Sequence, residues 1–152
     1  MTNSAVGAGF THTASYGGSA YHADDSGTQN DWLVSPSIDI PADAVSATFA
    51  STSAMTYCSW YGSSSMGVST DGGATWDEGA SLPCSGTFTE HTIDLAAYAG
   101  QSVVVGIHYT GDYNHSAAFS DDKLFISSNG STKILSMYLL NIENFCSNSI
   151  FH

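Results

Sequence analysis

Two pairs of neighbouring aspartates are the residues of this sequence best suited to hold a metal ion. Asp24 and Asp25 lie in the turn-rich stretch 21–30, and Asp121 and Asp122 lie about one hundred residues later. Calcium favours hard oxygen ligands from flexible carboxylate-bearing loops and from backbone carbonyls. The spacing is not that of a single EF-hand loop, so both pairs would have to be brought together by the fold. Two interpretations stay open: a calcium site, or four solvated turn residues.

A second group combines histidines, tyrosines and an acid around one turn. Such a group is suited to stacking on a sugar ring or to ligating a metal ion. A histidine on a strand is more often hydrogen-bonded to its neighbours, and this structural interpretation stays open. The sequence shows no nucleophile elbow and no distinguishable pair of catalytic carboxylates, so binding is favoured over catalysis. The candidate ligand-binding residues are His108, Tyr109, Asp112, Tyr113 and His115.

The segment from Ser69 to Trp76 matches the Asp-box pattern S-x-D-x-G-x-T-W. Its Asp-Gly-Gly run suits a tight hairpin turn, which needs positive φ angles. We expect Asp71 to accept backbone N–H groups across the turn and Trp76 to fold back as an apolar plug. Sialidase propellers carry this box once per blade, but one copy in 152 residues cannot build a propeller. Asp71 and Trp76 are therefore predicted to brace a hairpin and to take no part in catalysis.

The charge of the chain is strongly negative. There are 14 acidic residues against two lysines, Lys123 and Lys133, and the formal net charge is −12. Nucleic acid is therefore not expected as a partner, because such binding relies on Lys and Arg. Anionic membrane surfaces are disfavoured for the same reason. Divalent cations are the natural counter-charge, although acidity that only keeps an extracellular protein soluble explains the same composition.

Cysteine usage gives weaker information. Cys58 and Cys84 flank the central hairpin region and are able to pair, whereas Cys146 lies in a different kind of sequence. None of the three has the spacing of a zinc site. The first residues lack the basic and apolar regions of a signal peptide, so we expect that a secreted form has already lost its export signal.

Short strands must position all these groups. Alternating apolar and polar residues between Gly, Ser, Asp and Asn are typical of strands. Their regular spacing predicts an all-β fold, a two-sheet antiparallel β-sandwich of the jelly-roll type. The segment 103–107 is apolar at both odd and even positions, which predicts a central strand covered on both faces. The expected strands are 9–16, 19–22, 31–40 (with Trp32 as a structural residue), 45–53, 55–60, 65–70, 88–94, 102–109 and 117–127.

The chain is expected to divide into a jelly-roll domain, residues 1–127, and an apolar, Asn- and Ser-rich tail, residues 128–152. The apolar run 134–142 is too short to span a bilayer, which needs about 20 residues, so membrane insertion is not expected. Three forms stay open for the tail: a last strand, a short helix that caps the sandwich, or a segment that docks on a neighbouring chain.

The order of these motifs resembles that of the cleaved-adhesin and choice-of-anchor J modules. The resemblance covers roughly residues 10–127 and rests on the segments 21–36, 69–76, 93–101 and 109–112 and on the late Asp-Asp pair. It implies a MAM-like or galactose-binding-like jelly roll. Such modules are usually appended to secreted peptidases or surface adhesins and often hold structural calcium.

From these observations we expect a non-catalytic extracellular or cell-surface module for adhesion or carbohydrate binding. Its partner would be a glycan or a protein ligand, and Ca²⁺ would stabilise it. One alternative is a subunit that self-associates into an extracellular fibre or surface layer, which the apolar tail and the lack of lysine on strand edges favour. A second alternative is an accessory domain of a secreted peptidase.

Overall fold

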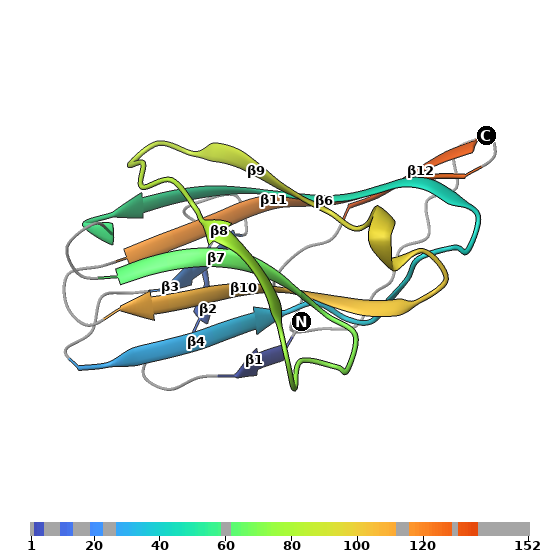
Figure 1. The fold of residues 1–152 in the computed structure, drawn as a ribbon. Coiled ribbons are helices and arrows are strands. Elements are labelled where there is room, and N and C mark those ends of the chain that lie inside the picture. Colours follow the sequence, from blue (N-terminus) through green and yellow to red (C-terminus); the bar gives the residue numbers. More distant parts are fainter. Residues whose placement is uncertain are drawn as a thin grey trace.

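Two antiparallel sheets pack face to face in this computed structural model, which describes residues 2–4, 10–13, 19–22, 27–58, 62–111, 116–128 and 131–136 (Figure 1). The predicted two-sheet β-sandwich is confirmed. Sheet A has the order β1-β4-β10-β7-β8, with β5 paired to β10, and sheet B has the order β2-β3-β11-β6-β9, with β12 paired to β11. In the described part of the chain, no helix is long and apolar enough to cross a membrane.

The strands of sheet A are β1 (Thr2–Ser4), β4 (Gln29–Val34), β5 (Ile38–Asp39), β7 (Gly62–Ser69), β8 (Asp77–Ser81) and β10 (Ser102–Gly111). Those of sheet B are β2 (Phe10–Thr13), β3 (Ser19–His22), β6 (Ala44–Thr56), β9 (Thr89–Asp94), β11 (Ser116–Ser128) and β12 (Ser131–Ser136). A short 3-10 turn, η2 (Ala96–Tyr98), lies between β9 and β10.

The hydrophobic core lies between the two sheets and takes alternate residues from the long strands β6, β10 and β11. Side chains of a strand point to opposite faces in turn, so each of these long strands gives one set of residues to the core and one set to the outside. Strand β10 is the third of the five strands along the path of sheet A, as the apolar segment 103–107 predicted. The largest fully buried side chains include Phe49, Phe119, Leu33, Ile107 and Tyr109.

Several predicted strand boundaries are wrong. The predicted strand 31–40 is two strands, β4 and β5, separated at Pro36, which has no N–H group for the ladder. The hydroxyl of Ser35 instead accepts a hydrogen bond from the backbone of Val105 at 2.9 Å. The predicted strand 45–53 and the first two residues of the predicted strand 55–60 lie in a single strand, β6, which ends at Thr56. Strand β8 was not expected, because its residues, all exposed, show no apolar alternation.

The first part of the tail continues sheet B. Strand β12 pairs with β11 in antiparallel register, with Leu135 opposite Leu124. Of the three forms left open for the tail, a strand is therefore the one found for residues 131–136. The rest of the apolar run, from Met137 onwards, lies outside the described residues.

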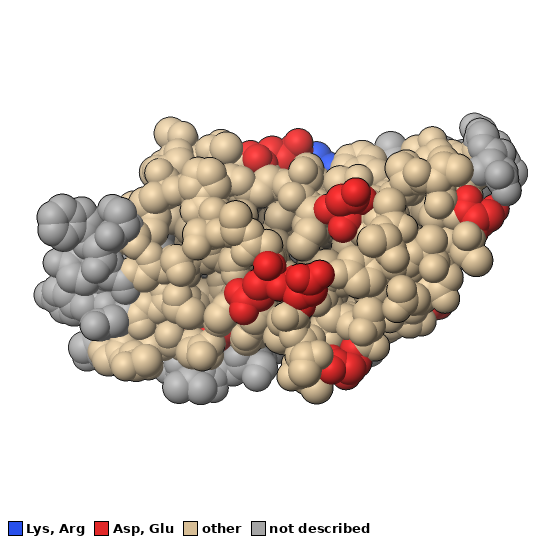
Figure 2. All heavy atoms as spheres, in the orientation of Figure 1, with Lys and Arg blue, Asp and Glu red and all other residues tan. Residues whose placement is uncertain are grey.

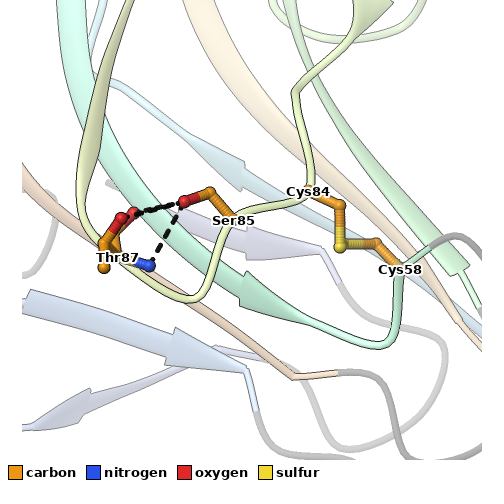
Figure 3. Close-up of a disulfide and its surroundings, with 4 residues drawn as sticks. All are labelled: Cys58, Cys84, Ser85 and Thr87. Carbon is orange, nitrogen blue, oxygen red and sulfur yellow. Dashed lines mark hydrogen bonds between the residues drawn. A yellow bond between two sulfur atoms is a disulfide. The ribbon is translucent and has the colours of Figure 1, made fainter.

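A disulfide joins two connections at one end of the sandwich. Cys58 follows β6, and Cys84 lies between β8 and β9 (Figure 3). The backbone N–H of Met55 also donates to the carbonyl of Ser85, at 2.7 Å, so the connection is fastened to β6 twice. Ser85 then forms a local turn by accepting a hydrogen bond from the N–H of Thr87 at 3.2 Å.

Candidate binding site

Three aromatic rings stack on the outer face of sheet A. Trp32 on β4 lies parallel to Trp76, with 4.0 Å between ring centroids and 10° between planes. It is also parallel to His108 on β10, at 4.2 Å and 7°. All three residues are half-buried. Trp32, Trp76 and His108, here called the ring stack, thus join three segments that are far apart in the sequence.

The two indoles of the ring stack lie over the backbone of two glycines. Gly67 on β7 is directly opposite Gly106 on β10 in the sheet register. A Cβ atom at Gly106 would lie 2.5 and 2.7 Å from two atoms of Trp76 and 2.7 Å from one atom of Trp32. At Gly67 the nearest atoms of both indoles are 3.3 Å away. Both indoles approach the backbone closely because neither glycine has a side chain, a use of glycine that is typical within strands.

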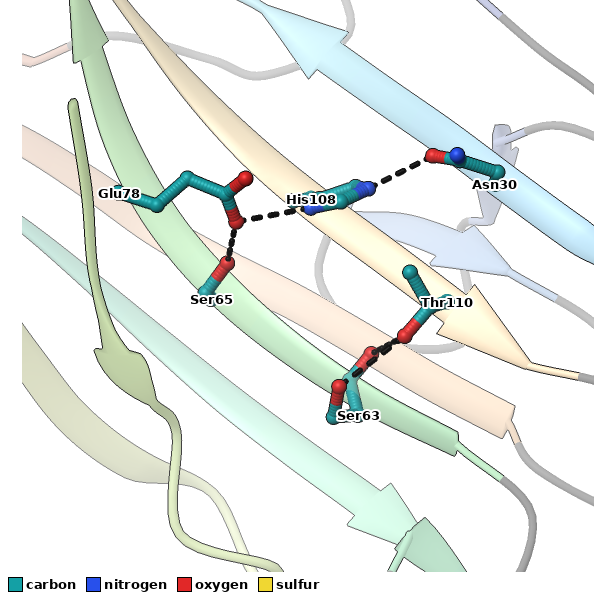
Figure 4. Close-up of polar contacts among 6 residues, drawn as sticks. All are labelled: Asn30, Ser63, Ser65, Glu78, His108 and Thr110. Atoms are coloured by element: carbon teal, nitrogen blue, oxygen red, sulfur yellow. Dashed lines mark hydrogen bonds and ion pairs between the residues drawn. The ribbon is translucent and has the colours of Figure 1, made fainter. Parts of the chain in front are cut away.

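A row of polar groups crosses the sheet beside the ring stack (Figure 4). The Nδ1 atom of His108 is 2.8 Å from a carboxylate oxygen of Glu78 on β8, and its Nε2 atom is 2.7 Å from the amide oxygen of Asn30 on β4. The hydroxyl of Ser65 on β7 donates to the same carboxylate oxygen at 2.7 Å. Glu78, Ser65, His108 and Asn30, here called the polar row, therefore link four strands.

The hydrogen bonds of the polar row keep Glu78 ionised. Partial burial raises the pKa of this carboxyl group, but the hydrogen bonds from His108 and Ser65 and the charge of His108 outweigh that effect. Its pKa is therefore lower than usual. Two residues along β10, the hydroxyl of Thr110 lies 3.0 Å from that of Ser63, which adds a second polar pair to the same face (Figure 4).

The Asp-box hairpin, residues 69–76, positions Trp76 on this face. Asp71 accepts hydrogen bonds from the N–H groups of Ala74 and Thr75 at 3.0 and 2.9 Å, and from the hydroxyl of Thr75 at 2.6 Å. The hydroxyl of Ser69 also donates to it, at 2.7 Å. The hydroxyl of Thr75, that of Ser69 and the backbone of Thr75 hold the pKa of Asp71 far below its usual range.

Two glycines let the hairpin turn, and Trp76 then folds back over it. Gly72 and Gly73 have φ angles of +76° and +96°, a backbone conformation that residues with a side chain rarely adopt. A Cβ atom at Gly73 would lie 3.2 Å from the indole of Trp76. The indole thus packs against its own hairpin and lies on the outer face of sheet A, outside the hydrophobic core cluster. It is half-buried and stacked on Trp32 instead.

Of the residues predicted to bind a ligand, His108 lies in the site and Tyr109 does not. Tyr109 has 0% exposure and belongs to the hydrophobic core. The prediction for Tyr109 is therefore wrong. Successive residues of a strand face opposite sides, so these neighbours on β10 cannot share one face. Asp112, Tyr113 and His115 lie outside the described residues.

The side chains of the four predicted calcium ligands lie outside the described part of the structure. Asp24 and Asp25 lie outside the described residues, and of Asp121 and Asp122 only the backbone, in β11, is described. Among the described side chains, no three His, Cys, Asp or Glu residues gather in a way that suits a metal ion. A role for Ca²⁺ thus stays a prediction.

Sequence reasoning missed Asn30, Ser65 and Glu78. Asn30 lies in the segment 21–36 but was given no role there, and Ser65 and Glu78 belong to no motif; each reaches the site through strand pairing that the sequence does not reveal. One signal was available. Gly67 and Gly106 interrupt predicted strands, and a glycine inside a strand often marks a place where another group approaches the backbone closely.

The described residues form a β-sandwich with aromatic and polar side chains on one outer face. No protein-family model matches the sequence, and no curated protein matches it. Among solved structures, carbohydrate-binding module CBM61, determined in complex with β-1,4-galactotriose, is similar with a TM-score of 0.62 and 12% identity. The similarity covers 83% of this chain and 88% of that module.

Further solved structures share the fold. A CBM4 carbohydrate-binding module has a TM-score of 0.53 and 14% identity over 82% of this chain and 94% of its own. The glycoside hydrolase domain of Endo-D from Streptococcus pneumoniae R6 has a TM-score of 0.51 and 13% identity over 85% of this chain but only 26% of its own. The jelly-roll module expected from the order of motifs is thus confirmed in its fold.

The K1 cleaved-adhesin domain of Lys-gingipain from Porphyromonas gingivalis W83 is also similar, at 17% identity, over 84% of this chain and 91% of that domain. Its TM-score is 0.49. The particular relationship to cleaved-adhesin modules stays a prediction.

Proposed function

We propose that this chain is a non-catalytic binding module that holds a neutral glycan on the outer face of sheet A. The observation that carries the proposal is the position of the ring stack directly beside the polar row. The C–H faces of a sugar pack well on aromatic rings, and a few fixed polar groups orient its hydroxyls, as in other small-ligand sites. The fold supports the proposal, because it is shared with two carbohydrate-binding modules.

The chemistry of Glu78 and His108 suits binding better than proton transfer. A general acid for glycoside hydrolysis needs a raised pKa, whereas the pKa of Glu78 is lowered by its hydrogen bonds. Both ring nitrogens of His108 already have partners. The two side chains therefore act as a fixed frame to which a ligand is held.

The charge of this face favours a neutral ligand. Figure 2 shows acidic side chains gathered at the centre of the view, over β8, whose acidic residues are Asp77 and Glu78. The blue of a lysine is visible in this view only at its upper margin. A uronate, sialylated or sulfated sugar would meet like charges here. Hydroxyl-rich neutral sugars carry no such penalty.

We further infer that the module works outside the cell or in another oxidising compartment. The disulfide between Cys58 and Cys84 supports this location, because disulfides persist mainly in secreted and surface proteins. Self-association into a fibre and attachment to a secreted enzyme stay alternatives. Light scattering of the purified chain tests the first, because a monomer at high concentration contradicts it.

A glycan array followed by calorimetry tests the proposed function. We expect the chain to bind neutral oligosaccharides and to ignore sulfated and sialylated ones. Trp32→Ala should weaken binding at least tenfold, which corresponds to about 1.4 kcal/mol. Tyr57→Asn is the matched control, because Tyr57 is 62% exposed, lies after β6 in sheet B, and has a left-handed φ of 57° that Asn tolerates. An array without neutral hits, or equal effects of both variants, would overturn the proposal.

A further inference from the structure

We propose that Asn30 determines the ligand specificity of the outer-face site, and that the protonation of His108 decides whether Asn30 offers a ligand a hydrogen-bond donor or an acceptor. This inference rests on the proposed function for its ligand. The device itself, a histidine that orients an amide, belongs to the chain alone and is tested without a ligand.

The geometry fixes what His108 must donate. One ring nitrogen faces a carboxylate oxygen of Glu78 at 2.8 Å, and the other faces the amide oxygen of Asn30 at 2.7 Å. Both oxygens are acceptors, because the carboxylate is ionised and an amide oxygen carries no hydrogen. Both contacts are hydrogen bonds at the same time only if both ring nitrogens carry hydrogens. With this orientation of the Asn30 amide, the ring is the protonated imidazolium.

The ring is held in place while its charge changes. His108 stacks on Trp32 at 4.2 Å with 7° between the planes, and only 16% of its side chain is exposed. Glu78 is the charged group that contacts it among the described residues, and it is anchored by Ser65. The other contacting groups, Trp32 and Asn30 on β4, are neutral.

Loss of the proton leaves one ring hydrogen, and the carboxylate of Glu78 retains it. The lone pair on the other nitrogen of His108 then faces the oxygen of Asn30 at hydrogen-bond distance, which is repulsive. Half a turn of the Asn30 amide replaces its oxygen by its NH₂ group and restores the bond. The amide is free to make this turn toward solvent, because Asn30 is exposed.

The group that Asn30 offers to a ligand is the one turned away from His108. With His108 charged, this is the NH₂ donor, and with His108 neutral it is the carbonyl acceptor. The site therefore exchanges a donor for an acceptor when His108 loses its proton. Acceptor-only groups of a sugar, such as a ring oxygen or an acetamido carbonyl, are favoured at the acidic end.

Nuclear magnetic resonance of the free, ¹⁵N-labelled chain tests the switch. As the pH is raised, we expect the ring of His108 to pass from two N–H groups to one. The side-chain amide signals of Asn30 should shift with the same midpoint, and a scalar coupling between its nitrogen and Nε2 of His108 should appear only at the basic end. Asn30→Asp should move the midpoint of His108 upwards, because a carboxylate stabilises the charged ring.

Thr110→Val is the matched control, since Thr110 lies two residues along the same face of β10 and should leave the midpoint unchanged. Signals of Asn30 that ignore the titration of His108 would overturn the switch even if glycans bind. A glycan array without hits overturns the proposed function and leaves these spectra as they are. With an identified sugar, the affinity of the chain should change severalfold across the midpoint, and that of Asn30→Asp should stay flat.

Discussion

The two faces of strand β10 follow different rules although they belong to one short segment. The residues toward the core are nearly fully buried and apolar except for one phenol, so packing alone accounts for them. The residues toward the outside are chemically mixed and include a glycine in the middle of a strand. A face that only had to be covered would not need that glycine or a histidine. The inner set is Val103, Val105, Ile107 and Tyr109, and the outer set is Val104, Gly106, His108 and Thr110.

The largest effect should come from the inner face. Ile107→Ala should lower the free energy of unfolding by about 2–5 kcal/mol, the usual cost of a cavity in a core. The neighbouring His108→Ala should cost only about 1.5–3 kcal/mol of unfolding free energy, the range for a lost hydrogen bond to a charged group, but should abolish glycan binding. Urea denaturation and calorimetry of both variants measure this difference. If a folded His108→Ala chain still binds the glycan, the outer face of sheet A is not the binding site.

This contrast also explains what the sequence revealed. Alternation and turn residues predicted the sandwich, because burial of every second side chain produces a visible alternation of apolar and polar residues in the sequence. The prediction for Tyr109 groups it with His108 around one turn, although the predicted strand 102–109 already places these two neighbours on opposite faces. The ring stack was not foreseen. It brings together Trp32, Trp76 and His108 through the order and register of the strands, which depend on the whole sheet.

Next in size is the disulfide, which belongs to neither face. Cys58 and Cys84 are 26 residues apart. Replacing both by serine should cost about 3 kcal/mol, because the unfolded chain regains the freedom of that loop. The signals of the stacked indoles in near-ultraviolet circular dichroism should persist, since the bond lies at the end of the sandwich. Loss of those signals in a still-folded variant would show that the bond positions the site as well.

The predicted calcium site should have a comparable effect on stability. If Ca²⁺ binds the folded chain through Asp24, Asp25, Asp121 and Asp122, then Ca²⁺ at 100 times its dissociation constant adds about 2.7 kcal/mol. Melting curves with Ca²⁺ and after chelation measure this contribution. Mg²⁺ at equal concentration controls for simple screening of the net charge. Identical curves under all three conditions would exclude calcium.

A smaller effect is expected at the floor of the ring stack. In Gly106→Ala the added methyl group would meet both indoles, with distances of 2.5 to 2.7 Å before any movement. Relief requires the rings to move apart, which should cost about 1–3 kcal/mol, as other overpacked positions do. The exciton signal of the Trp pair in circular dichroism should fall, together with glycan affinity. Gly79→Ala is the control, because there the nearest atom is a backbone oxygen at 3.4 Å.

The smallest effect is a change of stability with pH, which distinguishes a histidine beside the core from carboxylates on the outer side of the molecule. His91 lies on the same side of β9 as Ile93, which packs against the core. Burial lowers the pKa of His91, so the unfolded chain binds this proton more readily than the folded one. Its neutral form therefore contributes full stability only above about pH 6.5, the ordinary value for histidine. Below that pH the contribution is lost.

The carboxylates of the outer side act in a lower range of pH. Hydrogen bonds lower the pKa of Asp71, and that of Glu78 is lowered despite its partial burial. Both groups stabilise the fold above the pKa of a free carboxyl group, about 4, and lose this contribution as the pH falls through their folded pKa values. His91→Gln should therefore abolish only a decline that begins near neutrality, and Asp71→Asn only one that begins below about pH 4. Unfolding free energies of the original chain and of both variants across this pH range test these expectations. A single decline shared by all three chains would mean that His91 and Asp71 do not act independently.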